Sequence, residues 1–456
     1  MMGKYFGTDG FRGEAGVAPT ATHAYQIGRF LGWYGRQNGK KIRVAVGKDT
    51  RLSCYMLEYA VAAGLVASGA DVYLMHVTTT PSVCFTVVEE GLDLGVMITA
   101  SHNPYHDNGI KLIDKNGAKI EDKITEKIER YLDGDLAALG VTGTDLPFAV
   151  GREIGRIVDH EVARTRYARH LISAVPFELH GFRIGLDCAN GAASAIAPAV
   201  FEALGAMVYP IHTTPNGTNI NREAGALYPQ ALARHVLANG LDTGFAFDGD
   251  ADRCIAIDAT GKVINGDHML YLLAKHLFSR GELAKNTVVT TVMSNLGLYR
   301  ALRASGISYA QTAVGDRFVY ESMQENGYAI GGEQAGHIIL SKYATTGDGI
   351  LTALKVMEVM VSSGATLNEL TAPVVMLPQI TENLRVSDKR AVLEDERVIA
   401  VANAVGGRLG DAGRVLLRES GTEPVIRIMV EAASEELCRD CTREIAAAIR
   451  ETGLCQ

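Results

Sequence analysis

Apolar and polar residues alternate in a pattern that repeats along the chain. Three segments, which begin at Ile42, Phe182 and Thr287, each show an apolar run, a short polar loop, an amphipathic stretch, a glycine and a second apolar run. The short apolar runs are typical of buried strands and the amphipathic stretches of helices. A strand, helix, strand unit with a right-handed crossover builds a mostly parallel sheet with helices packed on it. The pattern therefore predicts three related α/β domains with mixed, mostly parallel sheets.

The pattern changes near residue 372, after which the repeat is not found. A closing strand is predicted for VIRIMVE, residues 425–431, followed by a last helix rich in Ala, Glu and Arg. We therefore predict a smaller α+β domain at the C-terminal end. Breaks marked by polar residues or proline, such as GTDLPF and LTAP, suggest domain boundaries. The expected domains are 1–150, 151–255, 256–371 and 372–456.

Length and composition narrow the class of protein. A chain of 456 residues is too long for one hydrophobic core. It has 47% hydrophobic residues but no run of the roughly 18 apolar residues that a membrane helix needs, so we expect a water-soluble protein. The first residues lack the apolar core of a secretory signal, which favours a cytoplasmic location. The net charge of -8 argues against a nucleic-acid surface, and an anionic substrate would need a locally basic cleft.

The cysteines do not indicate a disulfide framework. There are seven of them, an odd number, scattered along the chain. Cys438 and Cys441 form a single C-x-x-C in a helix-like stretch, with no second pair to complete a zinc site. We therefore expect reduced thiols with a structural role.

One serine follows an apolar run that predicts a buried strand. Residues 94–100 form that run, and Ser101 opens the polar turn SHNPYHDNGIK. Pro104 disfavours helix at Asn103, and Asn108 before a glycine permits a tight turn, so a fixed loop can present the serine hydroxyl. The alternative is a serine that caps its own turn, which is the commoner use of a serine considered by itself.

Three aspartates lie close together between two short apolar runs. Asp248, Asp250 and Asp252 stand in FAFDGDADRCIAI, where Gly249 leaves room for the backbone to curl. Carboxylates this close repel one another, and a divalent cation with oxygen ligands, such as magnesium, removes that repulsion. The usual calcium-binding loop does not fit, because its required glycine and final glutamate would be an arginine and an alanine. A solvated acidic turn is the alternative.

Two further motifs have the residue types that bind a phosphosugar. RESGTEPVIR combines guanidinium groups, hydroxyls and flexible backbone amides, which suit a phosphate, although a β-turn with surface ion pairs would also explain it. GGEQAGH places Glu333 and His337 on a loop rich in glycine, where a carboxylate can accept hydrogen bonds from sugar hydroxyls or an amino group. The alternative for His337 is a structural histidine. The phosphate-binding candidates are Arg418, Ser420, Gly421, Thr422 and Arg427.

Taken in order, these motifs and the opening KYFGTDGFRG resemble those of the phosphohexomutase superfamily over nearly the whole chain. The opening motif, with MSNLGL, VGDRFV and TTGDG, is most similar to the phosphoglucosamine mutases of bacteria. The resemblance implies domains arranged around a central cleft and an intramolecular phosphotransferase of the isomerase class. It implies that glucosamine 6-phosphate and glucosamine 1-phosphate are interconverted through a sugar bisphosphate, which also acts as activator. The product would supply UDP-N-acetylglucosamine synthesis for the cell envelope.

The resemblance also implies a role for each motif. Ser101 would carry a phosphate, and Arg12, Lys111 and His337 would be further catalytic residues. The loop that recognises the sugar would include Glu333, Ala335 and His337. The implied ligands of Mg2+ are Ser101, Asp248, Asp250 and Asp252. The implied ligands of the phosphate that is not reacting are Arg418, Ser420, Gly421, Thr422 and Arg427.

Two positions depart from the family pattern. Ala335 stands where serine is usual, and the missing hydroxyl is worth about 0.5–1.5 kcal/mol of sugar binding. Ala251, where glycine is frequent, is a milder change. Ala335 leaves a phosphoglucomutase or phosphomannomutase open as an alternative. A magnesium-dependent sugar phosphatase and a catalytically silent sensor are the alternatives from other classes. The expected partner is a small phosphosugar, with neither nucleic acid nor membrane, and a homodimer is the candidate oligomer.

Overall fold

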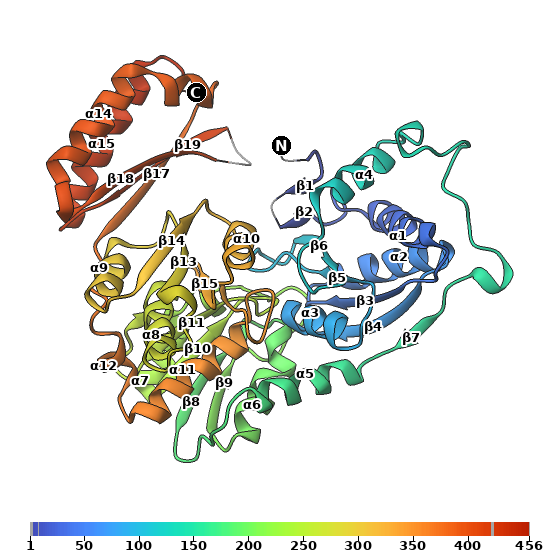
Figure 1. Ribbon diagram of the computed structural model, residues 1–456, viewed down its shortest axis with the longest axis horizontal. Coiled ribbons are helices and arrows are strands. Elements are labelled where there is room, and N and C mark those ends of the chain that lie inside the picture. The colour runs from blue at the N-terminus through green and yellow to red at the C-terminus, as the bar shows by residue number, and fades with distance from the viewer. Residues whose placement is uncertain (1–2, 8, 421–423, 456) are drawn as a thin grey trace. The chain divides into compact units, whose positions relative to one another are not determined.

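The computed structural model describes residues 3–7, 9–420 and 424–455. Over these residues the chain forms three α/β domains followed by a smaller α+β domain, which confirms the fold predicted from the repeated pattern (Figure 1). The α/β domains, apart from one helix, form a larger unit, and the remainder forms a C-terminal unit. These units are Met1–Val292 with Ile307–Thr371, and Met293–Gly306 with Ala372–Gln456.

The first domain is a mixed sheet between helices, with strand order β1-β2-β6-β5-β3-β4-β7. Alternate residues of its central strands face opposite sides: Val44 and Val46 pack with α1 and α2, whereas Ala45 packs with α3 (Figure 1). Its elements are β1 (Phe6–Gly7), β2 (Gly10–Glu14), α1 (Ala21–Gly35), β3 (Arg43–Lys48), α2 (Cys54–Ala67), β4 (Asp71–Val77), α3 (Thr80–Glu89), β5 (Leu94–Ile98), β6 (Asp107–Asp114), α4 (Asp122–Leu132) and β7 (Ile157–Asp159).

Helices α1 and α2 pack against each other through reciprocal glycines. A Cβ on Gly28 of α1 would lie 2.2 Å from the carbonyl oxygen of Val61, and one on Gly64 of α2 would lie 2.1 Å from that of Tyr25. Only glycine permits this approach of the two backbones. Thr20 begins α1 by accepting a hydrogen bond from the amide of the third helical residue.

The second and third domains repeat the central part of the first. Their strand orders are β12-β11-β10-β8-β9 and β14-β13-β15-β16. The elements of the second are α5 (Val162–Ser173), β8 (Arg183–Asp187), α6 (Ala197–Ala203), β9 (Met207–Ile211), α7 (Gln230–Asn239), β10 (Thr243–Phe247), β11 (Cys254–Asp258) and β12 (Val263–Ile264). Those of the third are α8 (Gly266–Ser279), β13 (Thr287–Thr291), β14 (Ser308–Thr312), α10 (Asp316–Asn326), β15 (Ile330–Gly332), β16 (Ile338–Leu340), α11 (Gly349–Ser363) and α12 (Leu367–Thr371).

All three α/β domains share one strand arrangement. In each domain the first strand of the repeat (β3, β8 or β13) lies between two parallel strands. One of these two strands (β5, β10 or β15) is followed by a turn and an antiparallel strand. These turns join β5 to β6, β10 to β11 and β15 to β16. The sequence repeat therefore continues into a strand pair that the apolar pattern did not identify as part of it.

The C-terminal unit has an antiparallel sheet of order β17-β19-β18 covered by helices. The helix of the third repeat, α9 (Leu296–Ala304), belongs to this unit, where the Leu296 amide donates to Glu431 Oε2 at 3.0 Å. The other elements are β17 (Gln379–Arg385), α13 (Lys389–Glu394), α14 (Glu396–Leu409), β18 (Arg414–Glu419), β19 (Val425–Glu431) and α15 (Glu435–Glu451).

One edge strand of each of the first two sheets lies past the domain boundaries that we predicted at residues 150 and 255. β7 belongs to the first sheet and β12 to the second, and the boundaries themselves remain predictions. Cys438 and Cys441 are buried in α15, in agreement with the structural role expected of them. Among the described residues, every helix is too short or too polar to cross a membrane.

A buried ion pair joins the first sheet to α2. Lys48 Nζ, at the end of β3, lies 2.5 Å from Glu58 Oε2, and both side chains are almost completely buried. The ammonium group also lies over the ring of Tyr55, 3.8 Å from its centroid. A buried pair of this kind contributes little net stability, but loss of either partner leaves a charge without compensation.

We predict that Glu58→Gln lowers the free energy of unfolding of the first domain by about 3–5 kcal/mol, because the Lys48 ammonium loses its counterion. The measurement is urea denaturation followed by the fluorescence of Trp33, the single tryptophan, which packs on the core of this domain. The control is Asp135→Asn, which breaks the exposed pair with Arg130 and should change this value by less than about 1 kcal/mol. Equal effects of the two substitutions would contradict the prediction.

Candidate active site

Ser101 lies in the turn between β5, which ends at Ile98, and β6, which begins at Asp107. Its φ of 50° is in the left-handed region, which costs a residue with a side chain roughly 1–2 kcal/mol. The side chain is buried, and its hydroxyl donates a hydrogen bond to Asp248 Oδ2 at 2.6 Å. The amide of Ser101 donates to Thr99 Oγ1 at 2.8 Å. The backbone thus aims the hydroxyl at a carboxylate of the second domain.

The three aspartates lie in the turn between β10 and β11. Asp248, Asp250 and Asp252 are buried, and one oxygen of each lies within 4.8 Å of the others. This turn packs directly on the serine turn, because a Cβ on Gly249 would lie 2.5 Å from the carbonyl oxygen of Ser101. The aspartates are therefore not the solvated acidic turn that remained possible from the sequence.

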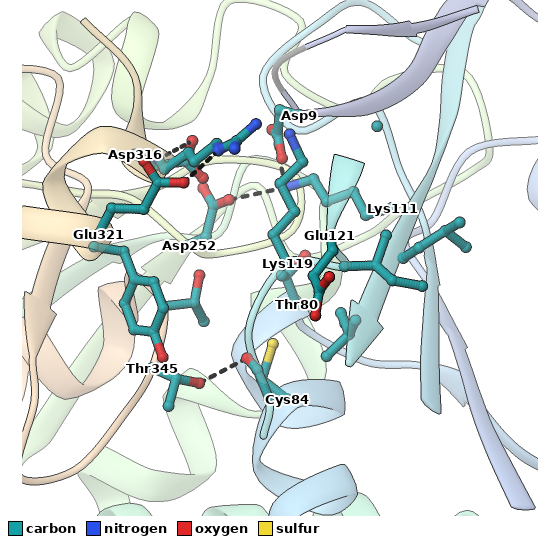
Figure 2. Close-up of a pocket in the computed structure, with 18 of the residues that line it drawn as sticks. Asp9, Thr80, Cys84, Lys111, Lys119, Glu121, Asp252, Asp316, Glu321 and Thr345 are labelled. Carbon is teal, nitrogen blue, oxygen red and sulfur yellow. Dashed lines mark hydrogen bonds and ion pairs between the residues drawn. The ribbon is translucent and has the colours of Figure 1, made fainter. Parts of the chain in front are cut away.

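Basic side chains of the first domain reach the aspartates. Lys111 Nζ, on β6, lies 2.9 Å from Asp250 Oδ2 and 3.0 Å from Asp252 Oδ2. It also lies 3.4 Å from Asp9 Oδ2, so that it stands between carboxylates of two domains (Figure 2). Arg12 pairs with Asp9 and faces the same cluster from β2. The structure thus brings together the aspartates and both basic candidates.

The protonation behaviour of the aspartates differs within the cluster. Burial raises the pKa of Asp248 well above its usual value, and the charges of Asp252 and Asp250 raise it further. Burial also acts to raise the pKa of Asp252, but Lys111 and other nearby cations outweigh it and hold the pKa at about 2. Burial lowers the pKa of Lys111, whereas the two nearest aspartates raise it well above the usual value. One carboxylate is thus much harder to ionise than another only four residues away.

The donor set of this cluster fits a hard divalent cation such as magnesium. Asp250 Oδ1 and Asp252 Oδ1 are buried and have no hydrogen-bond partner among the residues that the structure describes. Unsatisfied buried carboxylate oxygens are costly, and a cation that prefers oxygen ligands would satisfy them. The Ser101 hydroxyl, beside Asp248, adds a further oxygen at the same place.

The sugar-recognition candidates lie in the turn between β15 and β16, next to the aspartates. Burial raises the pKa of Glu333, whose Oε1 accepts a hydrogen bond from the Gly315 amide at 3.2 Å. The backbone of this turn is hydrogen-bonded to the start of β11, the strand that follows the aspartates: the Cys254 amide donates to the Gly336 carbonyl at 3.0 Å. Ala335 is exposed at the tip of the turn, where a serine would present its hydroxyl to solvent or ligand.

His337 is held in one tautomer by its surroundings. Its Nε2 accepts a hydrogen bond from the Gly347 amide at 3.2 Å, so a neutral His337 carries its proton on Nδ1. The backbone of His337 forms a bridge with that of Arg253, the residue after Asp252. Contacts of both its ring and its backbone therefore hold His337 beside the aspartates that are the candidate metal ligands.

A cavity of about 420 Å³ opens beside this cluster (Figure 2). The residues that line it include Lys111, Asp252, His337 and Asp9. The cavity is wide enough for a small ligand, whose surface would meet charges of both signs.

The phosphate-binding candidates lie in the C-terminal unit. Arg418 on β18 stands directly opposite Arg427 on β19, and Ser420 is buried at the end of β18. Burial lowers the pKa of Arg418, and the charge of Arg427 lowers it further. Two cations opposed across a sheet are unfavourable unless an anion lies near them. Gly421 and Thr422 fall outside the residues that the structure describes.

Sequence reasoning missed several residues of this site. Thr80, at the start of α3, donates to Asp250 Oδ2 at 2.5 Å, and Asp9 pairs with Lys111 and Arg12. Arg51 and Asn221 contact the backbone of the serine turn. A signal existed for Arg51, because it follows a buried strand at the sheet edge where Ser101 lies.

Family models match the chain in four consecutive parts. They describe phosphoglucomutase/phosphomannomutase α/β/α domains I, II and III and the C-terminal domain. The matched residues are 3–137, 165–261, 265–375 and 382–448, respectively.

Similar proteins of known name extend over the whole chain. A phosphoglucosamine mutase of Lachnoclostridium phytofermentans is 53% identical over 453 residues, which are 99% of each chain. One of Geobacillus thermodenitrificans is 44% identical, over 98% of this chain and 99% of its own.

A crystal structure of a phosphoglucomutase/phosphomannomutase family protein from Burkholderia thailandensis matches with a TM-score of 0.81. It is 25% identical, over 99% of this chain and 98% of its own. Because family models cover most of the chain and such relatives cover nearly all of it, the chain belongs to the phosphoglucomutase/phosphomannomutase family, the phosphohexomutases, and within it to the phosphoglucosamine mutases, which are isomerases.

Proposed function

We propose that this enzyme interconverts glucosamine 6-phosphate and glucosamine 1-phosphate through a phosphate carried on Ser101. The observation that carries the proposal is the buried Ser101 hydroxyl, 2.6 Å from Asp248 within the aspartate cluster. Relatives that are 53% and 44% identical and are named phosphoglucosamine mutase support the choice of an amino sugar. The product would supply UDP-N-acetylglucosamine synthesis for the cell envelope.

The reaction has two half-reactions that balance each other. In the first, the bond between phosphorus and Ser101 Oγ breaks, and phosphorus bonds to a free hydroxyl oxygen of the sugar monophosphate. The proton of that hydroxyl passes in net to Ser101 Oγ, and a sugar bisphosphate results. In the second, Ser101 Oγ takes the other phosphate and the proton returns to the sugar oxygen that is released.

The residues around Ser101 suit such a transfer, which depends on position and on neutralised oxygen charge. Lys111 and Arg12 bring positive charge to the reacting centre, where they would stabilise phosphate oxygens. We assign Mg2+ to Asp248, Asp250 and Asp252 with the serine oxygen; when bound, it would neutralise charge on the phosphate.

Separate residues would bind the rest of the substrate. We assign recognition of the sugar hydroxyls and amino group to Glu333 and His337 on the turn that includes Ala335. We assign the phosphate that is not reacting to the opposed arginines of the C-terminal unit, Arg418 and Arg427, with the buried Ser420.

The first test concerns the phosphate itself. Intact-mass measurement of active protein should find one phosphate, and peptide mapping should place it on Ser101. Ser101→Ala should remove turnover because no acceptor oxygen remains. Ser173→Ala, which removes an exposed hydroxyl bonded within its own helix, should leave turnover unchanged. Full activity of Ser101→Ala would overturn the scheme, and release of inorganic phosphate at the rate of sugar consumption would indicate a phosphatase.

The metal assignment can be tested by removal and titration. Chelation with EDTA should stop turnover, and Mg2+ should restore it. Asp250→Asn should raise the Mg2+ concentration for half-maximal activity by at least about tenfold, because changes that only perturb a metal ligand already cost that much. Asp242→Asn, at a backbone contact away from the cluster, is the matched control. An unchanged Mg2+ requirement in Asp250→Asn would contradict the assignment.

Sugar preference can be tested at the recognition turn. The wild-type enzyme should show a higher kcat/KM for glucosamine 6-phosphate than for glucose or mannose 6-phosphate. Ala335→Ser should lower KM roughly two- to tenfold through the added hydroxyl. Ala138→Ser, an exposed serine introduced elsewhere, should leave KM unchanged. Preference for a neutral sugar would identify a phosphoglucomutase or phosphomannomutase instead.

A further inference from the structure

Arg51, in the loop after β3, directs both terminal nitrogens of its guanidinium group at the turn that carries Ser101. Its side chain is fully buried, and a guanidinium has about five N–H donors to satisfy. Each donor has an acceptor, one carboxylate and four backbone carbonyls. The acceptors are Asp49 Oδ2 (2.8 Å), the carbonyls of Ser101 (2.8 Å), Asn103 (2.8 Å) and Asp107 (3.0 Å), and that of Pro104.

Asn221 of the second domain binds two of the same carbonyls. Its Nδ2 donates to the carbonyl of Ser101 at 2.8 Å and to that of Asn103 at 3.0 Å. Its own backbone has a φ of 57° and its amide donates to the Ala189 carbonyl at 2.9 Å. The carbonyl of Ser101 is therefore held from two domains at once.

The other side of Ser101 is fixed through the partner of Arg51. Asp49 Oδ2 accepts from Thr99 Oγ1 at 2.7 Å, and the same oxygen of Thr99 accepts from the Ser101 amide at 2.8 Å. Both peptide groups that flank the Ser101 side chain thus have buried partners. A left-handed backbone at a serine persists only where its surroundings hold it in this way.

This support differs from the bond between Ser101 and Asp248 in one respect. Phosphorylation of Ser101 removes the hydroxyl proton that Asp248 accepts, and it brings negative charge towards that carboxylate. The bonds to the Ser101 carbonyl involve no atom that reacts. They are therefore available in the phosphorylated and unphosphorylated enzyme alike.

We propose that Arg51 and Asn221 are positioning residues that hold the Ser101 backbone, and so keep Oγ in line for phosphoryl transfer in both half-reactions. The inference rests on the proposed phosphoserine. A displacement of about 1 Å at a reacting atom can lower the rate about 100-fold, which sets the scale of the expected effect.

Arg51→Lys tests the first residue. A lysine ammonium cannot serve acceptors spread as widely as a guanidinium fork does. We expect kcat to fall about 100-fold, because the turn that carries Ser101 is disturbed. KM should stay within about twofold of the wild-type value, because the recognition turn between β15 and β16 is unchanged. Arg29→Lys is the matched control: Arg29 is equally buried in the first domain and donates to Ser68 Oγ at 2.6 Å. It should lose stability without this fall in kcat.

Asn221→Gly keeps the test valid if Arg51→Lys does not fold. Glycine adopts the left-handed backbone without strain, so the donor is lost while the fold is spared. We expect kcat to fall about tenfold, since the hydrogen bond from Arg51 to the Ser101 carbonyl remains when that from Asn221 is lost. Glu223→Gly is the control, because Glu223 has a φ of 49° but is exposed.

The readout is the rate at which phosphorylated enzyme converts glucosamine 6-phosphate to glucosamine 1-phosphate in a single turnover, measured by rapid quenching, because the second half-reaction restores the phosphate on Ser101. Slower transfer in Arg51→Lys and Asn221→Gly, with transfer near the wild-type rate in both controls, would support the proposal. Transfer at the wild-type rate in Asn221→Gly, or an equal fall in Arg29→Lys, would overturn it. Wild-type protein without phosphoserine would instead refute the proposed function on which it rests.

Discussion

Repulsion among three buried carboxylates is the constraint on which this site depends. At about 5 Å and an effective dielectric constant of about 20, two like charges repel by about 3 kcal/mol. Asp248, Asp250 and Asp252 lie within that range of one another and away from water. Lys111 offsets part of the repulsion by pairing with two of them. Burial, and then the charges of Asp252 and Asp250, raise the pKa of Asp248 well above its usual value. A cation bound to the cluster would offset more of this repulsion.

The repeated fold explains how the residues of this site meet. In each α/β domain, an outer parallel strand is followed by a turn and an antiparallel strand, and candidate site residues lie in that turn. Ser101 lies between β5 and β6, the aspartates between β10 and β11, and Glu333 to His337 between β15 and β16. Three copies of one turn thus carry the proposed nucleophile, the candidate metal-binding cluster and the proposed recognition turn. Backbone hydrogen bonds, such as that from the Cys254 amide to the Gly336 carbonyl, hold neighbouring turns side by side.

The sequence was informative where one physical signal acts locally. Short apolar runs and amphipathic stretches predicted the strands and helices of the repeats, and short motifs pointed to Ser101 and the aspartates, which the structure brings together. It failed where contacts join distant residues. Arg51 and Asn221 are 170 positions apart, and no local pattern indicates that both bond to the Ser101 carbonyl. The placement of α9 in the C-terminal unit was also missed, because helix periodicity does not specify what a helix packs against.

Backbone strain at the site limits which residues can occupy three of its positions. Ser101, Asn221 and Ala251 all have left-handed backbones, and each costs roughly 1 kcal/mol or more relative to glycine. In the proposed mechanism the Ser101 side chain carries the phosphate, and the Asn221 side chain is a hydrogen-bond donor, so glycine could replace neither of them without loss of that group. Ala251 has no such role, but its backbone bonds to Asp248 and Gly349 hold the turn, and a methyl group there restricts the unfolded chain more than glycine does. The strain is therefore tolerated where buried hydrogen bonds fix the backbone.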